Sequence, residues 1–475
     1  MEQIVNKELL SQLCSEGDNS IAIYNPADEH ILGYVPSLSE QEICRRIASS
    51  KSAQKLWKKR TAADRCAVLR RWYDLLLENA DDLARLMTLE QGKPLAEAKG
   101  EVMYGAGFVQ WFAEEGKRTY GETIPSPAES KRLLTIKQPV GVTAAITPWN
   151  FPIAMITRKV APALAAGCSC LIKPANQTPL CAYAIASLAY QAGLPEDLLI
   201  VVNSHSSVMV GDIFCSHPDI KKLSFTGSTP VGSALIKQTA DSVKRTSMEL
   251  GGNAPFIVFN DADIDAAVAG AIASKFRNAG QTCVCANRFY VQDDIYEEFV
   301  DRFVFAVSQL KIGNGLGCDV QVGPVIDQNA KSNILQTIQQ AVEQGAEIRY
   351  GGEPMPGNFV QPTVLTNVDQ QMSIVQQELF GPVAPVIRFS DTDDLIEKAN
   401  DTIYGLASYF YTRDLNRAFF VAEELEYGMV GINEGIISTE VAPFGGVKQS
   451  GFGREGAKQG IDEYLNIKYM CIGGM

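Results

Sequence analysis

The chain has 475 residues, more than one ordinary hydrophobic core can organise, so two or three domains are expected. Hydrophobic residues make up 46% and charged residues 20%, as in a water-soluble globular protein. The 42 basic and 55 acidic residues give a net charge of −13 without a long basic run, which argues against a nucleic-acid partner.

The N-terminal segment MEQIVNKELLSQLCSEGDNS has neither the apolar core of a signal peptide nor the arginine-rich character of a transit peptide. No later segment reaches the roughly 18 consecutive apolar residues of a membrane span. We therefore expect a cytosolic protein with no membrane partner.

Eleven cysteines are scattered along the chain in an odd number, which is typical of reduced thiols rather than of a disulfide framework. The only histidines are His30, His205 and His217, and none stands in a cysteine or carboxylate cluster. We therefore expect no metal site and no histidine-based catalytic pair, so a catalytic cysteine would need a carboxylate as its base.

In chain order, residues 40–118 carry helix-forming residues at helical spacing and predict a helical block that ends near Gly116. A β-branched segment and a Pro/Asn turn follow, and then a helix closed by Gly167. Strand and helix patterns alternate from there, with a helix at about 229–240, and a second alternating region extends to about residue 435. This alternation predicts two α/β domains built on parallel sheets.

Two motifs resemble ligand-binding sequences but do not meet the requirements of those sites. Residues 451–456, GFGREG, match a dinucleotide-binding fingerprint, but fewer residues follow than the ~30 that such a βαβ unit needs. The DADID run at 261–265 resembles the start of a calcium loop, yet Ala266 stands where the loop requires glycine. We interpret DADID as the start of a helix, where acidic residues favour the helix dipole.

The junction SFTGSTPVG predicts a strand that runs into a helix, with Thr226, Gly227 and Ser228 offering backbone N–H groups to a phosphate. Lys173 ends an apolar strand, where ligands of such sheets bind, although an ordinary solvated strand end has the same pattern. Glu249 lies in an uncharged run that suggests burial, which fits either a general base or a structural ion pair.

The stretch FRNAGQTCVCANR places Cys283 in a turn between a helix and a strand. It is either an exposed nucleophile or a buried small hydrophobic residue. Arg277 and Arg288 are expected to lower its pKa. Asn150 lies in the turn TPWNFP, where it is either a functional residue or an asparagine that only stabilises the turn.

Seven short segments occur in a fixed order over nearly the whole chain: WNFP, KPA, FTGS, ELGG, GQTC, QELFGP and PFGG. Together they resemble the NAD(P)-dependent aldehyde dehydrogenase superfamily. The forms ITRK, KFRNAGQTCVCANR and IISTEVAPFGG are similar to those of its succinate-semialdehyde dehydrogenases. Because the ELGG glutamate is present, the resemblance favours hydrolysis over acyl transfer to coenzyme A, and the intact motifs argue against a non-catalytic relative.

The resemblance implies that Cys283 attacks the aldehyde carbon, that the Asn150 amide and the Cys283 N–H hold the oxyanion, and that Glu249 activates the hydrolytic water. For the cofactor it implies that Lys173 and Glu378 hold ribose hydroxyl groups. It further implies that a cleft is formed by Trp149, Thr226, Gly227, Ser228 and Phe380.

Asn176 stands where NAD-selective relatives often carry glutamate. A neutral amide beside Lys173 removes a charge that would repel the 2′-phosphate, so we expect a preference for NADP with NAD also used.

The resemblance also suggests that Arg277, with Arg158 and Ser438, binds the distal carboxylate of succinate semialdehyde. Glutarate semialdehyde and a broader aldehyde range are the alternatives, since one methylene is worth only ~1–3 kcal/mol. If the chain is extended at Cys283, Cys285 shares its face at ~6.5 Å and is a candidate redox partner.

The implied fold is the aldehyde dehydrogenase fold, with a Rossmann-like cofactor domain (residues 1–121 and 141–250) and an α/β catalytic domain (residues 251–450). A small β extension (residues 122–140 and 451–475) would join subunits into a homotetramer or homodimer.

Overall fold

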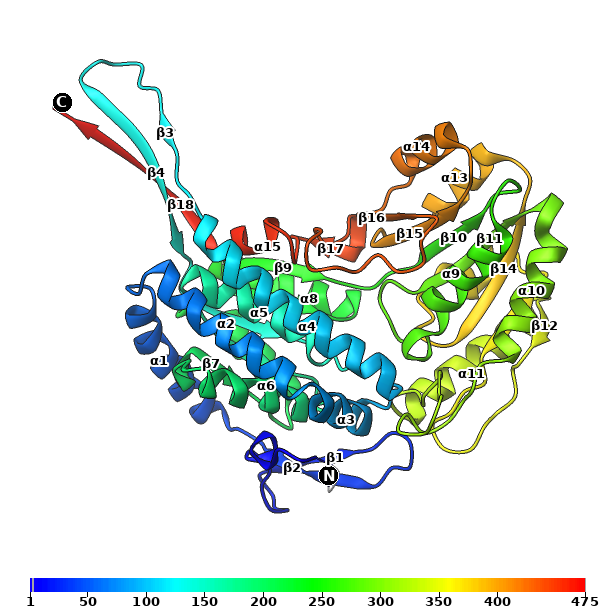
Figure 1. Cartoon of the computed structure of the whole chain (residues 1–475), viewed down its shortest axis with the longest axis horizontal. Helices are drawn as coiled ribbons and strands as arrows, with labels where there is room; N and C mark the ends of the chain where they lie inside the picture. The colour runs from blue at the N-terminus through cyan, green and yellow to red at the C-terminus, as the bar shows by residue number, and fades with distance from the viewer. Residues whose placement is uncertain (2–3, 475) are drawn as a thin grey trace.

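The computed structural model describes residue 1 and residues 4–474, which form two α/β lobes and a projecting three-stranded arm (Figure 1). Each lobe is built on its own sheet, in agreement with the two α/β domains predicted from strand–helix alternation. The N-terminal lobe also carries a separate antiparallel hairpin, β1 (Ser20–Tyr24) and β2 (Ile31–Pro36).

The sheet of the N-terminal lobe has six strands in the order β17-β9-β8-β5-β6-β7. Neighbouring strands in this sheet are parallel, except that β17 is antiparallel to β9. The strands are β5 (Val142–Ile146), β6 (Ser169–Lys173), β7 (Leu199–Val201), β8 (Ile220–Thr226), β9 (Arg245–Glu249) and β17 (Gly451–Phe452).

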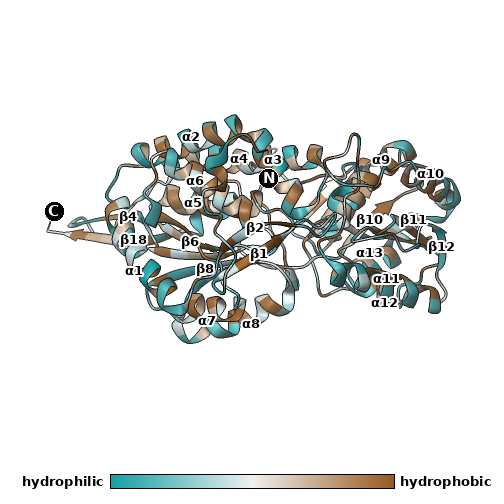
Figure 2. Cartoon of the chain, turned by 90° about the horizontal axis from the view of Figure 1, so that it is seen from below, coloured by the Kyte–Doolittle hydropathy of each residue, from teal (hydrophilic) through white to brown (hydrophobic). Residues whose placement is uncertain are grey.

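Helices cover both faces of this sheet (Figure 2). On one face lie α2 (Ala62–Glu78), α3 (Ala80–Gln91), α4 (Leu95–Glu115), α5 (Ala154–Ala166) and α6 (Pro179–Gln191), and on the other α1 (Glu40–Trp57), α7 (Ser207–Ser216) and α8 (Thr229–Thr239). Each face has its own hydrophobic core. The strands are therefore buried on both sides, as expected for a parallel sheet.

The helix ends follow from local sequence. Ser39 and Glu42 form a capping box at the start of α1, and Gly167 closes α5 in the left-handed conformation with φ 98°. Asp263 caps α9 (Ile264–Phe276) by accepting from the Ala266 N–H. The DADID run is thus a helix start, as predicted.

The second lobe has seven strands in the order β12-β13-β14-β11-β10-β15-β16, all parallel to their neighbours except β12. They are β10 (Ala254–Val258), β11 (Ala286–Gln292), β12 (Glu347–Tyr350), β13 (Thr363–Thr366), β14 (Val383–Phe389), β15 (Ala407–Tyr411) and β16 (Met429–Ile432). One face carries α9 and α10 (Tyr296–Ser308), and the other α11 (Gln328–Glu343), α12 (Ser373–Gln376) and α13 (Thr392–Asn400) (Figure 2). Helix α14 (Leu415–Glu424) follows β15.

The arm is an antiparallel sheet in the order β18-β4-β3, formed by β3 (Thr123–Ile124), β4 (Lys131–Pro139) and β18 (Leu465–Gly473). It projects from the N-terminal lobe (Figure 1). Its C-terminal part begins at Leu465 rather than at 451, because residues 451–452 pair with β9 and α15 (Gln459–Asp462) packs against α5. No helix among the described residues is long and apolar enough to cross a membrane.

Candidate active site

The turn that carries Cys283 lies between α9 and β11, where the two lobes meet. It spans Thr282–Cys285 and is closed by a hydrogen bond from the Cys285 N–H to the Thr282 carbonyl (3.2 Å). Just before it, Asn278 and Ala279 have φ values of 52° and 54°, in the left-handed region that non-glycine residues rarely adopt. Such strain is common at functional sites, where surrounding contacts hold the backbone in place.

A cavity of about 420 Å³ opens above Cys283. Its lining includes the predicted residues Trp149, Asn150, Glu378 and Phe380, and the rings of Trp149 and Phe380 meet edge to face with centroids 5.5 Å apart. Residues from both lobes therefore enclose one space, although the sequence separates them by more than 200 positions.

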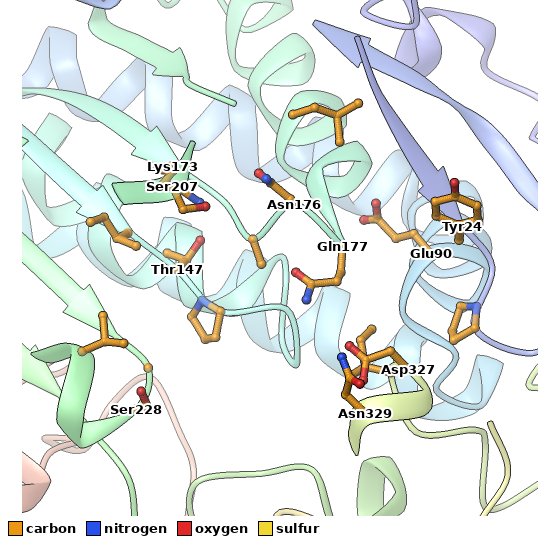
Figure 3. A pocket seen from close by; sticks show the side chains of 18 of the residues that line it. Tyr24, Glu90, Thr147, Lys173, Asn176, Gln177, Ser207, Ser228, Asp327 and Asn329 are labelled. Carbon is orange, nitrogen blue, oxygen red and sulfur yellow. The ribbon is translucent and has the colours of Figure 1, made fainter. Parts of the chain in front are cut away.

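A second cavity, of about 920 Å³, adjoins the first, and both are lined by Thr226, Gly227 and Ser228. It continues along the carboxyl ends of the strands to Lys173 and Asn176. Figure 3 shows the side chains that line it. The two cavities together run from Lys173 and Asn176, past the N-terminal turn of α8, to Cys283. Such a space suits a ligand that places phosphate groups at the helix N-terminus and a reacting ring near the cysteine.

The groups around this second cavity fit a nucleotide cofactor. The Ser228 side chain makes no capping hydrogen bond at the start of α8, so it does not occupy the N–H groups of the first turn. A β-carbon on Gly227 would lie 2.5 Å from the Phe225 ring. Burial lowers the pKa of Lys173 to about 8, and its Nζ donates only to the Pro174 carbonyl (3.2 Å) within the described residues. This lysine is a buried cation without an anionic partner.

Glu249 ends β9, one strand away from the Thr226–Ser228 turn, and its backbone carbonyl accepts from the Gly227 N–H (3.0 Å). Both carboxylate oxygens are buried without a hydrogen-bond partner among the described residues. Burial, together with the Glu455 carboxylate, raises the pKa of Glu249 well above its usual value. A raised pKa means that the Glu249 carboxyl group holds a proton more tightly than an ordinary carboxyl group does, and this is the direction of shift that favours a general base.

Asn150 is fixed by contacts from both lobes. Its side-chain Nδ2 donates to the Gln281 backbone carbonyl (3.0 Å). Its backbone carbonyl accepts from Lys93 Nζ (2.8 Å) and Asn278 Nδ2 (3.1 Å). Asn150 lines the cavity that holds Cys283, and its amide has a second N–H besides the one bound to Gln281. That N–H is a preorganised donor for negative charge that develops near the sulfur.

A model of the aldehyde dehydrogenase family matches residues 14–470. The chain belongs to the aldehyde dehydrogenase family. It is 56% identical to a 3-sulfolactaldehyde dehydrogenase of Pseudomonas putida, with 97% of this chain and 95% of that protein covered. It is also 56% identical to the NADP(+) succinate-semialdehyde dehydrogenase GabD of Escherichia coli strain K12, with 99% and 98% covered. The crystal structure of an aldehyde dehydrogenase from Brucella melitensis superposes with a TM-score of 0.98 at 52% identity over 100% of both chains.

The turn that carries Cys283 in this aldehyde dehydrogenase corrects one expectation. Burial raises the pKa of the Cys283 thiol to about 12, and the charges of Arg158 and Arg277 offset only part of this rise. Arg288 is not among the groups that lower this pKa, and its guanidinium instead donates hydrogen bonds to the Asn253 and Ala399 carbonyls. The expectation of a lowered thiol pKa is therefore wrong for the protein without bound ligands.

Cys285 differs from its predicted geometry as well. The chain at Cys283 is a turn rather than an extended segment, and the Cys285 thiol contacts the Lys275 and Ala286 carbonyls (3.5 Å each). Both cysteines are free. An oxidative pairing of Cys283 with Cys285 would therefore require the turn to open, and the redox role of Cys285 stays a prediction.

The arginines expected to bind substrate differ in their partners. Arg158 is fully buried, forms an ion pair with Glu455 and donates to Thr226 Oγ1 (3.4 Å). Arg277 lies over the Phe151 ring with its carbon Cζ 5.5 Å from the centroid, and its Nε is buried without a partner among the described residues. Ser438 is half-buried in the loop after β16.

Two supporting residues were not identified from the sequence. Lys93 is buried in an ion pair with Glu101 (2.5 Å) while it holds the Asn150 carbonyl. Glu455 is the buried anion for Arg158 and Lys159, whose charges lower its pKa although burial would raise it. The only available signal was the Arg-Lys pair inside an otherwise apolar helix, which indicates a buried counter-charge without identifying it.

Proposed function

We propose that this aldehyde dehydrogenase oxidises succinate semialdehyde to succinate, with NADP as its preferred cofactor and NAD as a second. The observation that carries the proposal is the unpaired Nε of Arg277, a buried donor six residues before Cys283. A buried guanidinium N–H without a partner is costly unless a ligand accepts from it, and the planar fork of arginine suits a carboxylate. The E. coli relative, named for succinate semialdehyde and NADP, supports the same assignment.

In the proposed reaction, Cys283 Sγ gives its proton to a water molecule and attacks the aldehyde carbon. The oxygen of the resulting thiohemiacetal takes up negative charge, and the Asn150 amide and the Cys283 N–H stabilise it. A nicotinamide bound in the adjoining cavities supplies the acceptor for the hydride. The product on the protein is then a thioester of Cys283.

Glu249 is assigned to the second half of the reaction. Its carboxylate takes a proton from a water molecule, the water oxygen attacks the thioester carbon, and the C–S bond breaks to release the acid. Glu249 then returns its proton to the sulfur, which restores the thiol and the carboxylate. Its two carboxylate oxygens make no hydrogen bond within the described residues, so neither is committed to another protein group.

The cofactor preference rests on Asn176. Its Nδ2 donates to the Ser204 carbonyl (3.0 Å), and its Oδ1 accepts from Asn203 Nδ2 (3.4 Å), so the side chain is held as a neutral group on the cavity that contains Lys173. No carboxylate opposes a 2′-phosphate at this position. Lys173 and Glu378 are assigned to the ribose hydroxyl groups, and Trp149 and Phe380 to the walls of the cleft.

Glutarate semialdehyde is the competing substrate. A glutarate-semialdehyde dehydrogenase of Pseudomonas aeruginosa is 55% identical, with 97% of this chain and 96% of that protein covered. One added methylene changes binding by only ~1–3 kcal/mol, so both semialdehydes are expected to react and succinate semialdehyde to react faster.

Assembly into a homotetramer or homodimer is part of the proposal. The arm projects from the lobe and leaves Ile467 and Tyr469 72% and 58% exposed (Figure 1). These side chains lie on one face of β18, and a second subunit would cover them. Light scattering on the parent and on an Ile467→Lys, Tyr469→Lys variant tests this, and an unchanged mass would contradict the assignment.

The functional test is a steady-state comparison of succinate semialdehyde, glutarate semialdehyde and butanal, each with NADP and NAD, in the parent and in Arg277→Ala. The parent should prefer both charged aldehydes over butanal and NADP over NAD. Arg277→Ala should lose roughly ten- to a hundredfold in kcat/KM on the charged substrates only. A parent that prefers butanal would contradict a pocket built for a carboxylate.

A further inference from the structure

Helix α4 carries a tyrosine whose hydroxyl group has no assigned function. The Tyr104 Oη is buried and has no hydrogen-bond partner among the described residues. Its ring packs against Phe108, with centroids 4.8 Å apart and planes tilted by 59°. A buried hydroxyl without a partner costs folding free energy, so its presence calls for a ligand atom that completes it.

The packing of α4 brings the Tyr104 segment to two elements that carry proposed substrate-binding residues. At Gly105 the helix touches α5, since a β-carbon there would lie 3.3 Å from Thr157 Oγ1 and 3.4 Å from Ala154 Cα. At Gly107 it touches the loop after β16, since a β-carbon there would lie 3.1 Å from Glu440 Cδ. Tyr104 thus belongs to the segment of α4 that packs against both α5, which carries Arg158, and the loop that carries Ser438.

The charges around the hydroxyl agree with this placement. Burial raises the pKa of Tyr104 to about 12, Arg158 and Arg277 counteract part of the rise, and Glu455 and Cys283 add to it. The hydroxyl is therefore protonated at neutral pH and lies within the electrostatic reach of both guanidinium groups and the thiol.

We propose that the Tyr104 hydroxyl donates a hydrogen bond to the distal carboxylate of the substrate, beside Arg277 and Arg158. The inference rests on the proposed semialdehyde function and adds a specificity residue to it. Glu455 already neutralises much of the charge of Arg158. A carboxylate accepts about four hydrogen bonds, so a neutral hydroxyl can fill a site that the arginines leave open.

The test uses Tyr104→Phe, which removes the hydroxyl and keeps the ring. The ratio of kcat/KM for succinate semialdehyde to that for butanal should fall roughly tenfold or more, through a higher KM for the semialdehyde, because a hydrogen bond to a charged group is lost. The matched control is Tyr296→Phe in α10, which removes another buried hydroxyl, one that donates to the Val386 carbonyl (3.3 Å), and should leave the ratio unchanged.

A ratio in Tyr104→Phe within twofold of the parent value would overturn the inference. If the parent shows no preference for the charged aldehyde, the proposed function itself fails. If the parent shows the preference, Arg277→Ala loses it and Tyr104→Phe keeps it, only the Tyr104 assignment fails. Should Tyr104→Phe not fold, Tyr104→Gln, which retains a donor, should keep a higher ratio than Tyr104→Leu, and the reverse order would contradict the proposal.

Discussion

Gly252 and Cys283 touch through their backbones: a β-carbon on Gly252 would lie 2.3 Å from the Cys283 carbonyl oxygen. This contact joins the segment after Glu249 to the catalytic turn, so the proposed base and nucleophile are set relative to each other. We expect Gly252→Ala to lower kcat at least tenfold, because the turn must move and a small misplacement of reacting groups is costly. Steady-state kinetics check this. The control is Gly100→Ala, because a β-carbon at Gly100 meets nothing within 4 Å.

The Lys93–Glu101 ion pair predicts a loss of stability. Lys93→Met leaves the buried Glu101 carboxylate without its cation and should destabilise the fold by ~3–5 kcal/mol. The melting temperature should fall by several degrees, whereas removal of the exposed Lys99–Asp81 pair by Lys99→Met should change it little. Equal melting temperatures for the two variants would show that the buried pair contributes no more than the exposed one.

The raised pKa of Cys283 predicts how its reactivity depends on pH. Because the thiol titrates at about 12, only a small fraction is thiolate at neutral pH, and that fraction rises about tenfold per pH unit. Alkylation of the Cys283 peptide by iodoacetamide, followed by mass spectrometry in the protein without cofactor, should therefore accelerate steadily between about pH 7 and 10. The urea-unfolded chain should instead level off near the ordinary pKa of ~8.5. A plateau near neutral pH in the folded protein would mean that the arginines prevail over burial.

Asn176 provides a prediction on the cofactor. Asn176→Glu places a carboxylate on the cavity beside Lys173, where it accepts from a ribose 2′-hydroxyl and repels a 2′-phosphate. The ratio of kcat/KM with NADP to that with NAD should fall by an order of magnitude. The isosteric Asn176→Asp is a second informative variant, since it should shift the ratio in the same direction; a shift toward NADP in either would contradict the assignment.

Much of the fold could be predicted because local sequence patterns determine it. Strand–helix alternation indicated both parallel sheets, and glycine and aspartate at helix ends marked α5 and α9 correctly. The order of short motifs indicated the family. The motif order also placed four residues in one site, although neither periodicity nor spacing relates them. One cavity is indeed lined by Cys283, Asn150, Glu378 and Phe380.

The remainder depends on contacts between distant segments. The partner of Arg158 is Glu455, 297 positions later, and no local pattern connects the two. The turn at Cys283 was expected from the sequence, but the left-handed conformations of residues 278 and 279 that precede it were not. Likewise, the net direction of the Cys283 pKa shift depends on how far burial outweighs two arginines, which only the three-dimensional arrangement determines.

The most direct test of the proposed chemistry is a single-turnover measurement on Glu249→Gln with succinate semialdehyde and NADP. The substitution removes the proton acceptor for water and leaves Cys283 and the cofactor cavity in place. NADPH should form in one rapid burst and then stop, and mass spectrometry of the quenched protein should find a succinyl thioester on the peptide that contains Cys283. Sustained turnover at the parental rate, or a succinyl group on a residue other than Cys283, would contradict the assignment of Glu249 and Cys283.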